Sequence, residues 1–231
     1  MARNILITGA NRGIGLELTK KYLSCGDRVF ALCRKVSPDL QATEASIIDN
    51  IDVTSLESLK MANQKVQEII GQEGGLDILI NNAGIMKDEK LEDFSSDNYV
   101  YDSILEQFQV NSLGPMKVYG VFSSMFKAGA KVVMITSRMG SITDNTSGGR
   151  YGYRTSKTAL NMLSTSLAQD LKPREIAVGI FHPGWVQTDM TGKTGHLTPE
   201  ESASNLFERI SELCLENSGD FYHSNGEKLD W

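Results

Sequence analysis

The segment Thr8-Gly-Ala-Asn-Arg-Gly-Ile-Gly15 decides the fold, because it places three glycines between an expected strand and an expected helix. The apolar run 4–7 precedes the segment, and an amphipathic stretch over 13–24 follows it. Glycines in such a turn let the backbone approach a pyrophosphate, and the free N–H groups that begin the helix favour its negative charge. An ordinary strand-to-helix turn is the alternative, but the place of this turn in the first strand–helix unit favours dinucleotide binding.

Short apolar runs and amphipathic stretches alternate along the rest of the chain. The runs do not alternate apolar with polar residues, which is typical of strands buried on both faces of a parallel sheet. We expect strands at 4–7, 29–32, 47–51, 77–80, 131–135 and 176–181, with a last short strand at 220–222. We expect helices at 13–24, 55–71, 98–127, 152–172 and 199–215, and a loop at 86–98. This alternation predicts one domain over 1–231, an α/β doubly wound Rossmann fold of about seven parallel strands flanked by helices on both faces.

Composition excludes several classes of function. The chain has 231 residues and a formal net charge of −6, whereas a general nucleic-acid binder carries a basic surface, so we expect no nucleic-acid partner. No apolar run approaches the roughly 20 residues of a membrane-spanning helix, and we see no signal peptide, so we expect no membrane association. Cys25, Cys33 and Cys214 lack metal spacing and the three histidines are scattered, which predicts free thiols, no metal site and a cytoplasmic location.

Two arginines favour NADPH over NADH. Sites selective for NAD usually place an acid about 20 residues after the turn, bonded to the ribose 2′-hydroxyl. The second expected strand ends in Ala31-Leu-Cys-Arg-Lys35, where no acid is present and Arg34 is. Arg12 lies within the turn itself, and two guanidinium groups suit a 2′-phosphate. The alternative is that either arginine is a solvated surface charge.

Tyr153 and Lys157 are the candidate acid/base pair. They are four residues apart and share one face of an expected helix. A tyrosine titrates near pH 10, and a neighbouring ammonium group lowers that pKa, so Tyr153 could protonate a developing alkoxide. The pattern is common by chance, and a surface pair is the alternative. Tyr151 is a rival proton donor, but Thr155 stands four residues after it, in place of a cation.

Polar residues follow two further expected strands. Ser137 comes directly after the run 131–135, and Asn81-Asn-Ala-Gly84 follows the run 77–80. Ligands of open α/β sheets bind at the carboxyl ends of the strands, so these residues can line a substrate and cofactor cleft. Both segments are equally compatible with ordinary turns.

Taken together and in order, these segments resemble the classical short-chain dehydrogenase/reductase family over essentially the whole chain. The resemblance rests on Thr8-Gly-x-x-x-Gly-x-Gly15, Asn81-Asn-Ala-Gly84, Ser137, Tyr153-x-x-x-Lys157 and Pro183-Gly184. It implies hydride transfer to or from a nicotinamide, with Tyr153 as the acid/base. It further implies that Lys157 lowers the pKa of that tyrosine and binds the nicotinamide ribose. By the same resemblance, Ser137 orients the carbonyl and Asn111 helps to hold a proton-relay water.

The resemblance extends the turn to a full set of cofactor contacts along the chain. They involve the adenine, its ribose, the pyrophosphate and the nicotinamide. The expected cofactor-binding residues are Gly9, Asn11, Arg12, Gly13, Ile14, Gly15, Arg34, Asp52, Val53, Asn81, Ala83, Gly84, Tyr153, Lys157, Pro183, Gly184, Val186 and Thr188.

A narrower resemblance is to sniffer-type carbonyl reductases and C-factor-like proteins. It rests on Gly148-Gly-x-Tyr-x-Tyr-Arg-Thr-Ser-Lys157, His182-Pro-Gly-Trp-Val-x-Thr-Asp-Met190 and Asn225-Gly-x-x-Leu-x-Trp231. We therefore expect NADPH-dependent reduction of an aldehyde, ketone or quinone. One alternative is a nucleotide-binding signalling protein of the C-factor type with little turnover. The other is an NAD-linked alcohol dehydrogenase, against which the two arginines argue.

Apolar residues on two expected helices suggest an assembly. Phe122, Phe126, Met162 and Leu163 lie beyond a single core-facing stripe of the helices near 111–127 and 152–172. The family resemblance implies that these helices form two-fold interfaces, so we expect a homodimer or a homotetramer. The alternative is that all four residues belong to the core.

Overall fold

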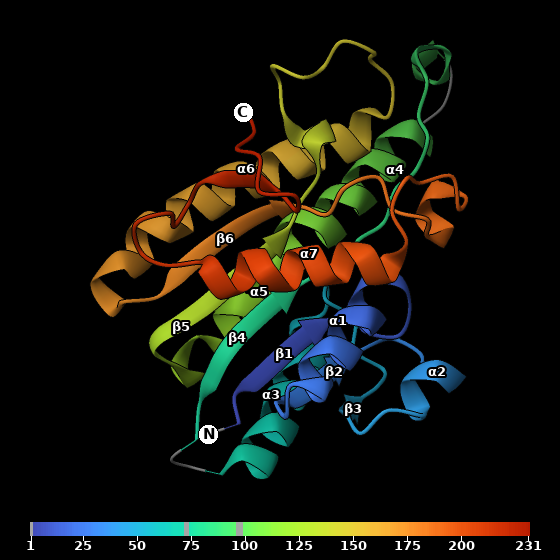
Figure 1. The fold of residues 1–231 in the computed structure, drawn as a ribbon. Helices are drawn as coiled ribbons and strands as arrows, with labels where there is room; N and C mark the ends of the chain where they lie inside the picture. The colour runs from blue at the N-terminus through green and yellow to red at the C-terminus, as the bar shows by residue number, and fades with distance from the viewer. Residues whose placement is uncertain (1, 72–73, 96–98) are drawn as a thin grey trace.

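Seven strands form one parallel sheet in the computed structural model, which describes residues 2–71, 74–95 and 99–231 (Figure 1). The strands are β1 (Asn4–Thr8), β2 (Arg28–Leu32), β3 (Ser46–Ile48), β4 (Leu76–Asn81), β5 (Phe126–Ile135), β6 (Ala177–His182) and β7 (Phe221–His223). Their order across the sheet is β3-β2-β1-β4-β5-β6-β7, and every neighbouring pair is parallel. The predicted doubly wound α/β fold is confirmed.

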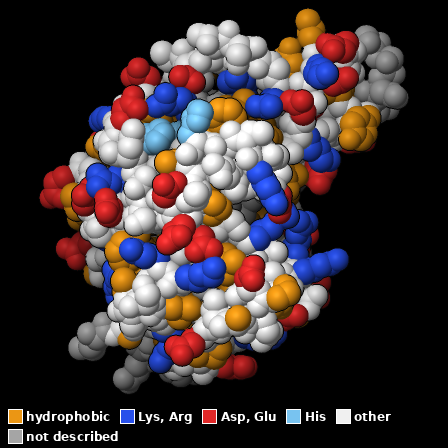
Figure 2. All heavy atoms as spheres, turned by 45° about the vertical axis from the view of Figure 1, so that its right-hand side comes forward, with side chains coloured by type: hydrophobic (Ala, Val, Ile, Leu, Met, Phe, Trp, Pro, Cys, Tyr) orange, Lys and Arg blue, Asp and Glu red, His pale blue; other side chains and the backbone are white. Residues whose placement is uncertain are grey.

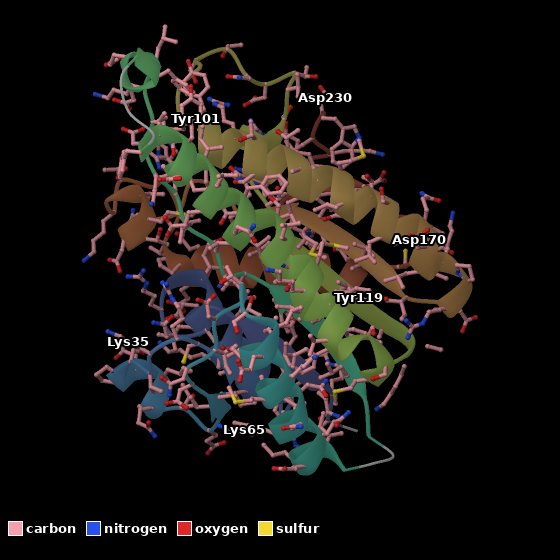
Figure 3. The ribbon with its side chains drawn as sticks, turned by 180° about the vertical axis from the view of Figure 1, so that it is seen from behind. Lys35, Lys65, Tyr101, Tyr119, Asp170 and Asp230 are labelled. Atoms are coloured by element: carbon pink, nitrogen blue, oxygen red, sulfur yellow. The ribbon has the colours of Figure 1, made fainter. Side chains whose placement is uncertain are left out.

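Helices cover both faces of this sheet, as Figures 1 and 3 show from opposite sides. The helices are α1 (Gly13–Ser24), α2 (Pro38–Gln41), α3 (Leu56–Ile70), α4 (Tyr99–Phe108), α5 (Gly114–Phe122), α6 (Tyr151–Leu171) and α7 (Pro199–Glu212). The buried residues of α1 and α7 pack against one face, and those of α3, α5 and α6 pack against the other. A capping box begins α7, because Thr198 and Glu201 exchange side-chain bonds with each other's backbone N–H.

The strands supply both cores because their side chains alternate between the two faces. Leu6 and Leu79 pack with α3, α5 and α6, whereas Ile5, Ile7 and Ile80 pack with α1 and α7. All five side chains are buried, which explains why the strands read as unbroken apolar runs.

The strand order reverses at the carboxyl ends of β1 and β4. The chain builds β1, β2 and β3 in one direction and then returns to lay β4 on the other side of β1. The connections that leave β1 and β4 therefore go to opposite faces of the sheet. Ligands of open α/β sheets bind at such a reversal.

The helix expected over 98–127 is wrong as a single element. The structure divides it into α4, a π-helical turn at Gln109–Leu113 and α5, and residue 98 lies outside the described residues. Pro115 at the start of α5 has no N–H to continue the preceding ladder, and π-helical turns occur where a helix is interrupted. A short 3-10 helix (Ser123–Met125) follows, and β5 begins at Phe126 rather than at 131.

Other boundaries differ by a few residues. The strand expected over 47–51 ends at Ile48, and the last strand is displaced by one residue to Phe221–His223. The short α2 was not expected. The expected loop at 86–98 contains a 3-10 helix at Leu91–Ser95, and its residues 96–98 lie outside the described part of the chain.

Two of the four apolar residues proposed for an interface are core residues. Phe122 is fully buried and Phe126 nearly so, because α5 and the start of β5 turn them toward the other helices of that layer. Met162 remains exposed on α6, and Leu163 is partly buried. Within the described ranges, no helix has the length and apolar character needed to cross a membrane.

Candidate active site

The phosphate-binding turn follows β1, and two of its glycines leave no room for side chains. Gly9 has a φ of +66°, and a Cβ there would lie 2.9 Å from the Cα of Ala83. A Cβ on Gly15 would lie 2.3 Å from the carbonyl oxygen of Gly9. Gly13 begins α1 with a φ of +54°. The turn therefore leaves backbone exposed at its glycines, at a helix N-terminus, which fits the pyrophosphate of a dinucleotide.

Thr8 and Asn82 fasten this turn to the end of β4. The side-chain amide of Asn82 donates to the carbonyl oxygens of Thr8 and Gly9, each at 3.1 Å. The Thr8 hydroxyl oxygen accepts the N–H groups of Asn82 and Ala83, also at 3.1 Å. The sequence identified Asn81, Ala83 and Gly84 as cofactor contacts but did not identify these two residues. In the sequence, the adjacent amide side chains of Asn81 and Asn82, directly after a strand, were the indication that polar contacts form here.

The two arginines expected at a 2′-phosphate are both exposed. The Arg12 guanidinium forms an ion pair with Asp189 at 2.7 Å. Arg34 follows β2, and its charge helps to lower the pKa of Asp52, after the larger effect of hydrogen bonds from Thr54. Figure 2 shows Lys and Arg side chains gathered along one side of the molecule's face. The exposed guanidinium groups fit the 2′-phosphate of NADP.

The segment after β6 lies over the same turn. A Cβ on Gly13 would lie 3.4 Å from the Cγ2 of Thr188, so this threonine faces the start of α1. Gly184 has a φ of +90°, and Val186 is buried. The Pro183 carbonyl accepts a hydrogen bond from the hydroxyl of Ser202 on α7 at 2.8 Å. This bond anchors the predicted nicotinamide segment to α7, and Thr188 places the segment against the phosphate turn.

Ser137, Tyr153 and Lys157 come together beyond the end of β5. All three are buried, and Ser137 lies close enough to the Tyr153 hydroxyl to favour its ionised form. The Lys157 Nζ lies 5.9 Å from the centre of the Tyr153 ring and donates to the carbonyl oxygen of Ile135 at 2.9 Å. The four-residue spacing on α6 therefore brings the pair to one face, beside the serine.

Burial dominates the titration of this group. It raises the pKa of Tyr153, while Ser137 and the charge of Arg150 act in the opposite direction. Burial also lowers the pKa of Lys157 to about 8. The cation that lowers the tyrosine pKa here is Arg150; the role assigned to Lys157 remains a prediction. The rival Tyr151 packs edge-on against Phe94, with the ring centres 4.8 Å apart.

Asn111 lies in the π-helical turn between α4 and α5 and is fully buried. Its side-chain amide donates to the carbonyl of Ile85 at 2.8 Å and to the hydroxyl of Ser156 at 3.0 Å. Its oxygen accepts the N–H of Ile85 at 2.8 Å. A Cβ on Gly84 would lie 3.2 Å from that oxygen and 3.7 Å from the Nζ of Lys157. The side chains of Asn111 and Lys157 therefore both lie next to Gly84.

Comparisons with known proteins agree with this geometry. A family model described as short chain dehydrogenase matches residues 3–198. The 1-hydroxy-2-glutathionyl-2-methyl-3-butene dehydrogenase of Rhodococcus sp. (strain AD45) is 36% identical, covering 98% of this chain and 99% of the relative. C-signal of Myxococcus xanthus is 39% identical over 161 residues, covering 68% of this chain and 94% of the relative.

Solved structures show the same similarity over the whole chain. The NADPH-bound carbonyl reductase from chicken fatty liver superposes with a TM-score of 0.88 at 30% identity, covering 100% of this chain and 99% of that chain. The carbonyl reductase Sniffer of D. melanogaster also gives a TM-score of 0.88 at 30% identity, with 100% of both chains covered.

Proposed function

The chain belongs to the short-chain dehydrogenase family, and on this premise we propose that it reduces the carbonyl group of a small aldehyde, ketone or quinone with NADPH. Family membership makes it an oxidoreductase. The observation that carries the proposal is the shared burial of Ser137 and Tyr153, with Lys157 beside them at the ligand-binding edge of the sheet.

Tyr153 is the proposed general acid. NADPH, when bound, supplies a hydride to the carbonyl carbon. Tyr153 donates its phenolic proton to the carbonyl oxygen, and Ser137 donates a hydrogen bond that orients the same oxygen. The ammonium group of Lys157 stabilises the phenolate as it forms. Asn111, with its amide fixed by backbone groups, is the proposed holder of the water that returns a proton to Tyr153.

NADPH is the proposed cofactor because two guanidinium groups stand where an NAD-selective site has an acid. Arg12 and Arg34 are exposed and can form bidentate bonds to a 2′-phosphate. The glycine turn, held by Thr8 and Asn82, would take the pyrophosphate. The similar chicken carbonyl reductase binds NADPH, which supports this choice.

Two other functions each have one observation in their favour. Similarity to C-signal favours a signalling protein with little turnover, but such a protein has no need of a buried proton donor. Similarity to a dehydrogenase of a hydroxylated glutathionyl compound favours oxidation of an alcohol, the alternative for which we expect NAD. The two arginines favour the reductase over this second alternative.

We also propose that residues 1–231 form one domain, since the sheet includes strands from Asn4 to His223. A homodimer or homotetramer remains our proposal, supported by the exposed Met162 on α6 and by Tyr101 and Leu105 on the neighbouring α4 (Figure 3). Unpaired Cys25, Cys33 and Cys214 support a reducing, cytoplasmic environment.

The experiment that tests the function is consumption of NADPH by the purified protein. The substrates are benzaldehyde, acetophenone and menadione, one for each carbonyl class, and NADH is the parallel cofactor. We expect turnover with at least one substrate and a higher kcat/KM with NADPH. Tight binding of NADPH without turnover of any carbonyl would favour the signalling protein. Turnover only of alcohols with NAD would favour the dehydrogenase.

A further inference from the structure

A second buried polar cluster lies next to the catalytic helix, centred on Glu89. This glutamate follows β4 and is 4% exposed. Its Oε1 accepts the hydroxyl of Ser103 at 2.5 Å and the side-chain amide of Gln107, both from α4. Its Oε2 accepts the backbone N–H of Gly152, in the first turn of α6, at 3.1 Å. One carboxylate therefore joins the loop after β4 to two helices.

Backbone hydrogen bonds tie the same three segments together. The N–H of Arg150 donates to the carbonyl of Glu89 at 2.8 Å, and the N–H of Lys87 donates to the side-chain oxygen of Gln107 at 2.9 Å. These bonds fix the position of the Glu89 side chain relative to the first turn of α6.

The start of α6 depends on this carboxylate because its own N-cap residue provides no side-chain acceptor. Arg150 occupies the N-cap position with a φ of +50° and makes no side-chain capping bond. The first N–H groups of a helix need acceptors from outside it, and a negative charge there is favoured by the helix dipole. Glu89 supplies both to Gly152.

The contact also has no spare room. A Cβ on Gly152 would lie 2.4 Å from the Nε2 of Gln107, 3.0 Å from the Oε1 of Glu89 and 3.0 Å from the Cα of Ile104. The first turn of α6 is thus pressed directly against α4 and the glutamate. A change at Glu89 is transmitted to the helix rather than absorbed by a gap.

The rest of α6 is held by other bonds. Thr158 donates to the carbonyl of Gly140 at 2.9 Å, and Thr136 donates to the side-chain oxygen of Asn161 at 2.6 Å. Lys157 lies beside these anchors, whereas Tyr153 directly follows Gly152. Loosening the Glu89 contact should therefore disturb Tyr153 more than Lys157.

We propose that Glu89 is a positioning residue that holds the first turn of α6 at the height where Tyr153 meets Ser137 and the substrate oxygen. The inference rests on the proposed function of Tyr153 as proton donor. Glu89 itself touches neither substrate nor cofactor in this proposal. Its effect is exerted entirely through the N–H of Gly152.

The test variant is Glu89→Gln, which keeps the shape of the side chain and replaces one acceptor oxygen with a donor. We expect kcat for carbonyl reduction to fall about tenfold to a hundredfold, since small misplacements of a reacting group have effects of that size. The Kd for NADPH should not change, because Lys157 and the phosphate turn keep their anchors. Hydrogen exchange should become faster at the N–H groups of 151–154 but not over 158–170.

A rescue variant and a control separate positioning from general damage. Gln107→Glu in the Glu89→Gln background restores an amide–carboxylate pair with the partners exchanged, and it should recover part of kcat. Glu89→Asp, which keeps the charge but shortens the reach to Gly152, should fold and show the same pattern of loss. Glu106→Gln, which removes only the exposed partner of Lys87 on α4, should leave kcat and exchange at α6 unchanged.

The outcomes distinguish this inference from the proposed function. An unchanged kcat in an active Glu89→Gln variant would overturn the inference, and so would an equal loss of kcat and NADPH affinity. If the unmodified protein reduces no carbonyl, the proposed function fails. The exchange measurement still decides then whether Glu89 holds the first turn of α6, since equal rates in both proteins would refute that contact's role.

Discussion

The phosphate turn and the catalytic helix are shaped in opposite ways. Around Gly9 and Gly15 the site is shaped by the absence of side chains, since a Cβ at either position would collide with backbone atoms. Around Tyr153 the site is shaped by buried polar side chains that bond to one another. The first region therefore tolerates no added atom at Gly9 or Gly15, whereas the second depends on its hydroxyls and charges.

The largest expected effect is on the catalytic side of this comparison. Tyr153→Phe removes one hydroxyl and keeps the ring, so packing should persist. We expect kcat to fall about 10²–10⁴-fold, the usual contribution of a general acid, while NADPH still binds. Steady-state kinetics and fluorescence titration of NADPH measure the two quantities. A parallel loss of cofactor binding would show that the two regions are not independent.

Two further variants belong to the same experiment. Lys157→Ala should be at least as damaging, because it removes both the cation near the tyrosine and a predicted cofactor contact. Tyr151→Phe should have little effect, since its ring packs against Phe94. A dead Tyr151→Phe enzyme beside an active Tyr153→Phe enzyme would reverse the assignment.

The second prediction concerns only the cofactor side. Arg34→Asp replaces a proposed 2′-phosphate ligand with the acid of an NAD-selective site. A charge-assisted hydrogen bond contributes about 1.5–3 kcal/mol, so Kd for NADPH should rise by about tenfold to a hundredfold. The Kd for NADH should not rise, and kcat at saturating NADPH should be retained. Equal affinity of the unmodified protein for both cofactors would contradict the role of Arg34.

The same contrast decides what the sequence could predict. The glycine turn was identified because its three glycines are neighbours in the chain and their spacing reflects one local backbone shape. The pair Tyr153 and Lys157 was identified because one helical turn separates them. The strands were identified because burial on both faces leaves an unbroken apolar run.

Features that depend on distant segments were not predicted. Glu89, Ser103 and Gly152 meet only when α4, α6 and the loop after β4 are packed, and no single stretch of sequence contains that pattern. Phe122 was misassigned to an interface for the same reason, since the layer that buries it comes from elsewhere in the chain. The break at the π-helical turn was missed because the residues around Pro115 are otherwise consistent with one helix.

The third prediction tests whether a buried titratable side chain makes the free energy of unfolding depend on pH. His182 ends β6, and burial, His223 and Arg138 lower its pKa from 6.5 to about 3. Between these values the unfolded chain binds one more proton than the folded chain. The free energy of unfolding should therefore fall as pH falls below about 6.5, by about 1.4 kcal/mol per pH unit from this residue.

Urea unfolding at several pH values between about 4 and 7 measures this slope. His182→Asn removes the titrating group, so its stability should decline less steeply toward acid than that of the unmodified protein. Parallel curves for the two proteins would contradict the assignment to His182.

The smallest expected effect lies where the phosphate turn meets the segment after β6. Arg12 of the phosphate turn is paired with Asp189 of the segment after β6, and both side chains are more than half exposed. Arg12 cannot hold this carboxylate and a 2′-phosphate with the same donors, so the pair should compete with NADPH.

An exposed ion pair contributes about 0.2–1 kcal/mol, and Asp189→Asn should therefore tighten NADPH binding by no more than about fivefold. NADH, which has no 2′-phosphate, should bind both proteins equally, and the gain for NADPH should shrink as salt screens the exposed charges. Weaker NADPH binding in Asp189→Asn would mean that the pair instead holds Arg12 in place for the phosphate, so that the segment after β6 assists the glycine turn rather than competing with its ligand.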